Sequence, residues 1–183
     1  MAQYKIAVII GSLRKESFNR KFAEALVKLA PREFTFQMLQ IGDLPLYNQD
    51  DDAHPSEQVQ RLKRDVSAAQ GLLFVTPEYN RSIPGVLKNV LDHASRPYGQ
   101  NAWAKKPAGV IGVSVGAIGT ALAQQHLRNI LAYLDVPTLG EPEAFIQMKD
   151  GLIDAAGEFA PDSCKFLQKW MDAYVAWVKK IAG

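Results

Sequence analysis

The stretch from Ile6 to Asn19 constrains the fold of this chain most, because an apolar run passes directly into a polar loop that contains a glycine. The run Ile6–Ile10 is typical of a strand buried on both faces. Gly11 then permits a sharp turn, and Ser17 can cap a helix that begins at the next residue. Serine hydroxyls and Arg14 beside a helix N-terminus predict a phosphate-binding loop.

An ordinary strand–turn–helix corner, with Ser17 as the cap and Arg14 in solvent, would explain the same motif. Two well-known phosphate motifs fit less well. A P-loop needs Ser or Thr after its Gly-Lys pair, whereas Lys15 is preceded by Arg14 and followed by Glu16. The dinucleotide fingerprint needs further glycines after Gly11, and residues 12–19 contain none. Any anion in this loop must therefore be held by side chains as well as by the backbone.

The length and composition predict one domain over residues 1–183, with a core large enough to need no metal or disulfide. The 21 basic and 19 acidic residues leave a net charge of +2, and no basic block suggests nucleic acid as a partner. No apolar run reaches the roughly 20 residues of a membrane span, so membrane insertion is not expected. The lone Cys164 excludes an internal disulfide and favours a cytoplasmic location.

Strand and helix patterns alternate five times along the chain, which is typical of a doubly wound α/β domain with helices on both faces of a parallel sheet. The expected strands cover residues 6–10, 34–41, 71–75 and 107–113, and a short edge strand is interrupted by Pro137 and Pro142. The expected helices start near residues 18, 56, 84, 120 and 161. This pattern predicts a flavodoxin-like, five-stranded sheet in the order 2-1-3-4-5.

In that order the topological switch point lies between strands 1 and 3, where the loops after strands 1, 3 and 4 meet. The loop after strand 3, from Thr76 to Gly85, gathers an acid, an aromatic ring, an amide and a hydroxyl. The loop after strand 4, from Ser114 to Thr120, is made mainly of small residues. A phosphate loop beside these two loops suits a mononucleotide with a broad heteroaromatic ring, and FMN is the first candidate.

Other conspicuous residues have plainer interpretations. Asp50–Asp52 with His54 resembles a metal site, but successive carboxylates usually form a solvated loop, and no metal is predicted. Trp103 covers a ligand or packs under its loop, and packing is favoured. His126 is expected on a helix surface or interface. The last helix presents Phe166, Trp170, Tyr174 and Val178 at helical spacing, which predicts a core face.

Motifs from most of the chain together resemble the NADPH-dependent FMN reductases, and within them the bacterial quinone and chromate reductase branch. The matching pieces are Gly11-Ser-Leu-Arg-Lys with Ser17 and Asn19, Pro45-Leu-Tyr47, Pro77-Glu-Tyr-Asn with Ser82 and Pro84-Gly85, Leu87-Lys-Asn89 with Asp92, Ser114 with Gly116 and Gly119, and His126-Leu-Arg128. The similarity departs from the family pattern at two positions. His93 stands where relatives often have Trp, and Thr120 replaces a common glycine.

The resemblance implies twelve cofactor-binding residues. Ser12, Arg14, Ser17, Phe18 and Asn19 would surround the FMN phosphate; Pro77, Glu78, Tyr79 and Asn80 would contact the isoalloxazine and ribityl parts; and Ser114, Gly116 and Gly119 would line the other side. It also implies a homodimer or homotetramer in which the helices after strands 3 and 4 pair.

The chemistry expected from this resemblance is an NAD(P)H oxidoreductase without a catalytic side chain, because the flavin itself carries the reaction. NADPH or NADH would reduce FMN, and a quinone, chromate or an azo dye would then accept the electrons in a ping-pong cycle. Two other classes remain open from the residues. A flavodoxin-type carrier would bind FMN and shuttle single electrons, although flavodoxins are commonly acidic. A flavin-free regulatory module would bind no FMN.

Overall fold

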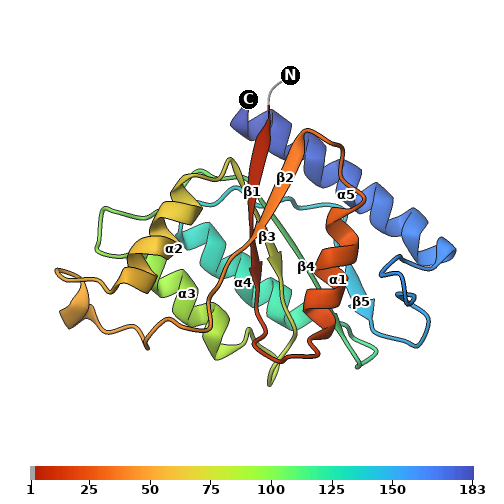
Figure 1. Cartoon of the computed structure of the whole chain (residues 1–183), viewed down its shortest axis with the longest axis horizontal. Coiled ribbons are helices and arrows are strands. Elements are labelled where there is room, and N and C mark those ends of the chain that lie inside the picture. The colour runs from red at the N-terminus through yellow and green to blue at the C-terminus, as the bar shows by residue number, and fades with distance from the viewer. Residues whose placement is uncertain (1–2) are drawn as a thin grey trace.

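The central feature of the computed structural model, which describes residues 3–183, is a parallel sheet of five strands with helices on both faces (Figure 1). The sheet order β2-β1-β3-β4-β5 confirms the predicted order. The strands are β1 (Tyr4–Ile10), β2 (Phe34–Met38), β3 (Gly71–Val75), β4 (Ala108–Ser114) and β5 (Phe145–Gln147), and the helices are α1 (Phe18–Val27), α2 (Glu57–Ser67), α3 (Gly85–Ser95), α4 (Ala121–Tyr133) and α5 (Pro161–Ala182), with a 3-10 turn η1 (Gln49–Asp51).

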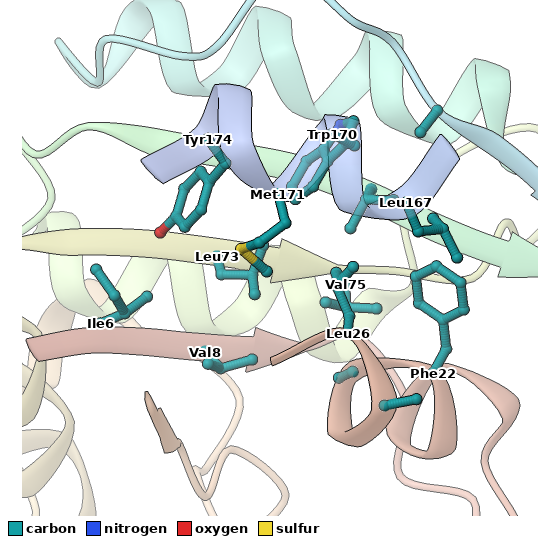
Figure 2. Packing of buried hydrophobic residues seen from close by; sticks show 14 of the residues in the cluster. Ile6, Val8, Phe22, Leu26, Leu73, Val75, Leu167, Trp170, Met171 and Tyr174 are labelled. Carbon is teal, nitrogen blue, oxygen red and sulfur yellow. The ribbon is translucent and has the colours of Figure 1, made fainter. Parts of the chain in front are cut away.

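Alternate residues of each strand pack into two separate hydrophobic cores, because successive side chains of a strand point to opposite faces of the sheet. From β1, Ile6 and Val8 pack toward α1 and α5, whereas Ala7 and Ile9 pack toward α2, α3 and α4. Figure 2 shows the first core, where Trp170 and other α5 residues lie over β1 and β3. The continuously apolar sequence of β1 thus reflects burial on both faces.

The structure corrects several predicted details. The second strand ends at Met38 instead of Ile41, because its register with β1 runs only as far as the pair of Met38 with Val8. The predicted core face of the last helix is wrong at Phe166, which is 42% exposed, because Leu167 takes the buried position. Trp103 is fully buried and donates from Nε1 to a backbone carbonyl, which confirms that it packs under its loop.

The strand register brings the loops of interest to one edge of the sheet. Ile10 lies opposite Val75, and Val75 lies opposite Ile111, so β1, β3 and β4 end close together. In Figure 1 these carboxyl ends lie at the lower edge, and the C-terminus of the chain lies at the upper edge. Among the described residues, no helix combines the length and the apolar character needed to cross a membrane.

Candidate functional site

The loop after β1 leads into α1 as the sequence predicts. Ser17 caps the helix, with its hydroxyl accepting from Arg20 N at 3.3 Å. Ser12 is buried, and Arg14 lies exposed with its guanidinium carbon 5.1 Å from the centre of the Phe18 ring. The first amides of a helix lack partners within the helix and carry a partial positive charge. This corner therefore presents amides, hydroxyls and a guanidinium, which are the groups that bind a phosphate.

Arg14 is available to bind an anion, because the acidic residue of this loop pairs with another cation. The neighbouring Glu16 pairs with Lys21 at 2.6 Å, and the hydrogen bond from Lys21 is the main reason that the pKa of Glu16 lies below its ordinary value. Within residues 3–183, Arg14 makes no ion pair with an acidic side chain. Its guanidinium instead lies over the ring of Phe18.

Asn19, which the resemblance assigns to the phosphate, has its side chain committed elsewhere. Its Nδ2 donates to the Val113 carbonyl at 2.8 Å, and its Oδ1 accepts from Val113 N at 3.0 Å. The pairing of β3 with β4 ends before this point, since Thr76 N bonds to Ile111 and Pro77 follows. Asn19 thus takes the place of the missing strand partner, and only its backbone N–H remains for a phosphate.

The loop after β3 forms a tight turn. Tyr79 and Ser82 exchange two backbone hydrogen bonds of 3.0 Å, and the residues between them have positive φ angles, 51° at Asn80 and 64° at Arg81. Tyr79 is 52% exposed at the rim. The carboxylate of Glu78 accepts from the backbone N–H groups of Leu122 and Ala123 at the start of α4.

The loop after β4 offers an uncovered stretch of backbone. An added Cβ at Gly116 would meet no atom nearer than 3.8 Å, so the backbone there is open to a flat ligand. Gly119 has a different role: its φ is +63°, and an added Cβ would lie 2.7 Å from the carbonyl carbon of Phe145. The hydroxyl of Ser114 donates to the Gly119 carbonyl and closes the loop.

Side-chain contacts join the three loops at the carboxyl edge of the sheet. Thr76 Oγ1 fills the space beside Gly11, so that an added Cβ would lie 2.8 Å from it. Asn19 links α1 to β4, and Glu78 links the second loop to α4. The twelve predicted residues lie in these three loops and at the start of α1.

Sequence reasoning missed the partner of Ser82. His126, expected on a helix surface or at an interface, is exposed on α4, and its Nδ1 lies 2.9 Å from Ser82 Oγ. No local spacing signals a pair of residues that lie 44 positions apart, although both belong to the motifs of the family resemblance. Their contact exists only because the second loop and α4 pack together.

Both departures from the family pattern are buried side chains. His93 is buried, with Nε2 2.8 Å from the Pro45 carbonyl and its ring edge-on to Tyr47. These residues border a separate hollow between α2, α3 and the loop before α2, which also contains Lys63. Burial lowers the pKa of Lys63, whose Nζ donates to the Arg96 carbonyl.

Thr120, the second departure, is also buried, and its hydroxyl accepts from Gln124 Nε2 at 2.9 Å.

Side chains suited to a metal ion do not gather in residues 3–183. No three His, Cys, Asp or Glu residues form such a group there, and this includes the loop from Asp50 to His54.

Comparison with known proteins identifies close relatives. A family model described as NADPH-dependent FMN reductase matches residues 4–150. A 2-hydroxy-1,4-benzoquinone reductase from a Burkholderia species is 54% identical over 176 residues, which cover 96% of both chains. A quinone reductase from Pseudomonas putida is 48% identical over 177 residues, which cover 96% of this chain and 95% of the relative.

Among solved structures, FerB from Paracoccus denitrificans, a flavoenzyme NAD(P)H:(acceptor) oxidoreductase, is similar with a TM-score of 0.94 and 47% identity. The match covers 97% of this chain and 98% of that chain. The likeness therefore includes the three loops and the helices that follow them.

Proposed function

The chain belongs to the NADPH-dependent FMN reductase family, and from this membership we propose that it transfers hydride from NAD(P)H to bound FMN and then two electrons to a quinone. The observation that carries the proposal is the gathering of the three loops at the carboxyl ends of β1, β3 and β4, with phosphate-binding groups at one end and open backbone at the other.

The residues of this edge fit FMN. The hydroxyls of Ser12 and Ser17, the guanidinium of Arg14 and the first amides of α1 match a terminal phosphate. At the other end, the bare backbone at Gly116 leaves room for a flat ring. Further binding residues in the proposal are Phe18, Asn19, Pro77, Glu78, Tyr79, Asn80, Ser114 and Gly119. Since the side chains of Asn19 and Glu78 are engaged elsewhere, these two would contribute through their backbone.

The division of labour follows from this arrangement. Bound FMN supplies the hydride and electron transfer, so the protein needs no nucleophile. The α1 corner would hold the phosphate, and the second and third loops would contact the ring. We propose that nicotinamide and quinone use the same side of the ring in turn, which gives ping-pong kinetics. Chromate and azo dyes are proposed as further electron acceptors, because such a rim would select only weakly for the shape of the acceptor.

The proposed assembly is a homodimer or homotetramer that pairs α3 and α4. Large apolar side chains remain exposed on α4, with Leu122 at 37% and Tyr133 at 80% exposure. Such residues favour a protein interface over solvent. The proposed location is the cytoplasm, where the free thiol of Cys164 would stay reduced.

Anaerobic stopped-flow mixing of the FMN-loaded protein with NADPH or NADH tests the reaction directly. Rapid bleaching of the flavin, followed by reoxidation with a quinone, is expected. Absence of bleaching with both nucleotides would favour a one-electron carrier, and failure to bind FMN would favour a flavin-free module. Steady-state lines that intersect instead of running parallel would refute the shared site.

A matched pair of variants tests the phosphate corner. Arg14→Ala should weaken FMN affinity by about tenfold or more, since a hydrogen bond to a charged group is worth roughly 1.5–3 kcal/mol. Lys15→Ala removes a neighbouring cation that is also exposed and should leave the affinity unchanged. Equal losses in both variants would reduce the role of Arg14 to general electrostatic attraction.

A further inference from the structure

The backbone turn after β3 is held in an uncommon conformation. Asn80 and Arg81 both have positive φ angles, of 51° and 64°. Asparagine tolerates a backbone with positive φ, but a residue with a long side chain such as Arg81 rarely adopts it. Glycine usually occupies the second position of such a turn. Strained backbone of this kind persists only where the surrounding structure holds it in place.

Glu78 fastens the first side of the turn to α4. Its Oε2 accepts from Leu122 N at 3.0 Å and from Ala123 N at 3.1 Å, and its side chain is 8% exposed. The residue before the helix, Thr120, makes no capping bond of its own. The carboxylate of Glu78 therefore acts as the N-terminal cap of α4, supplied from a distant loop.

The second side of the turn is fastened to the same helix. Ser82 Oγ lies 2.9 Å from Nδ1 of His126, which is one helical turn beyond Leu122. Within the turn, Arg81 Nη1 also pairs with Glu78 Oε1 at 3.2 Å. We call Glu78, Ser82 and His126 the α4 clamp.

We propose that Glu78 and His126 are positioning residues, which fix the Tyr79–Ser82 turn against the flavin site by tying both of its ends to α4. Neither side chain needs to touch the cofactor. This inference rests on the proposed function only in placing the flavin beside the turn. It assigns a task to His126 and gives the side chain of Glu78 a task other than a direct cofactor contact.

Substitutions at Glu78 separate positioning from a direct effect of charge. Glu78→Gln keeps an oxygen that can accept the α4 amides, whereas Glu78→Ala removes it. In the FMN-free protein, hydrogen exchange at the amides of Tyr79 and Ser82 should accelerate by about tenfold or more in Glu78→Ala and by less than about threefold in Glu78→Gln. FMN affinity, measured by titration, should fall in the same order.

Substitutions at His126 provide a second test, because this exposed residue can change without endangering the fold. His126→Ala should accelerate the same exchange and weaken FMN binding, and His126→Asn should restore both, since an amide can take the place of Nδ1. Asn129→Ala changes an exposed position further along α4 whose side chain makes no hydrogen bond within residues 3–183, and it should leave both quantities unchanged.

Several results would refute the proposed role of the α4 clamp. Unchanged exchange in Glu78→Ala and His126→Ala would show that it does not hold the turn. Faster exchange with unchanged FMN affinity would show that the turn does not position the flavin. Normal exchange in Glu78→Gln with FMN binding as weak as in Glu78→Ala would indicate a direct charge effect. If the wild-type protein bound no FMN, the proposed function would fail, whereas the exchange experiment would still test the clamp.

Discussion

Replacing Asn19 by alanine should destabilise the protein strongly even when no flavin is present. Asn19 is 3% exposed, and its two hydrogen bonds, of 2.8 and 3.0 Å, satisfy both backbone groups of Val113. Removing the amide leaves a buried N–H and a buried carbonyl without partners, at about 1–3 kcal/mol each. The expected loss in free energy of unfolding is therefore about 2–6 kcal/mol, which is a large share of the roughly 5–15 kcal/mol typical of a domain.

Urea denaturation of the FMN-free protein measures this loss without a contribution from ligand binding. A loss of about 3 kcal/mol corresponds to a drop of about 6–12 °C in Tm for a chain of this size. Arg20→Ala, on an exposed position of the same helix, should change stability by less than about 0.5 kcal/mol. If Asn19→Ala cost less than about 1 kcal/mol, Asn19 would not be a substitute strand partner for Val113.

Three further predictions concern glycine, charge and tryptophan. Gly119→Ala should lower the free energy of unfolding by about 2 kcal/mol or more, because Gly119 has a φ of +63° and an added Cβ would lie 2.7 Å from the backbone. Gly116→Ala should leave the FMN-free protein stable and weaken only FMN binding. Urea denaturation curves and FMN titrations distinguish the two variants. The bidentate bond to Arg61 lowers the pKa of Asp43, so its stabilising effect is present above about pH 4 and disappears as the pH falls through the lowered pKa. The free energy of unfolding of the wild type should therefore exceed that of Arg61→Met by up to about 1 kcal/mol at neutral pH, and the two values should converge as the pH falls. Trp103→Phe should cost about 2 kcal/mol in urea denaturation, because a buried carbonyl loses its donor, and should leave FMN affinity unchanged.

The elements of this fold could be predicted because their signals are local. The double burial of β1 is visible in five consecutive apolar residues, and the cap at Ser17 and the proline at the start of α5 mark helix ends directly. The alternation of strands and helices then leaves few topologies, since parallel crossovers are right-handed. Phe166 shows the limit of periodicity, which finds a helical face but not which of two adjacent residues faces the sheet.

The candidate site was predictable as a place, but not in the orientation of its side chains. The motif Pro77-Glu-Tyr-Asn identifies a recognition loop, yet nothing in it indicates that the carboxylate of Glu78 turns toward α4. The same holds for Asn19, whose residue type suits a phosphate contact as well as a backbone bridge. Residue type sets which hydrogen bonds a side chain can make, and the neighbours in space select among them.

The sequence by itself determined the strands, the helices, their order and the edge of the sheet where the three loops meet, because these depend on hydrophobic pattern, caps and connection rules acting over short distances. Only the tertiary structure decided that Asn19 completes β4 and that Glu78, Ser82 and His126 join the turn after β3 to α4. Those contacts span 44 to 94 positions, and they form because buried polar groups must find partners wherever the packing places them.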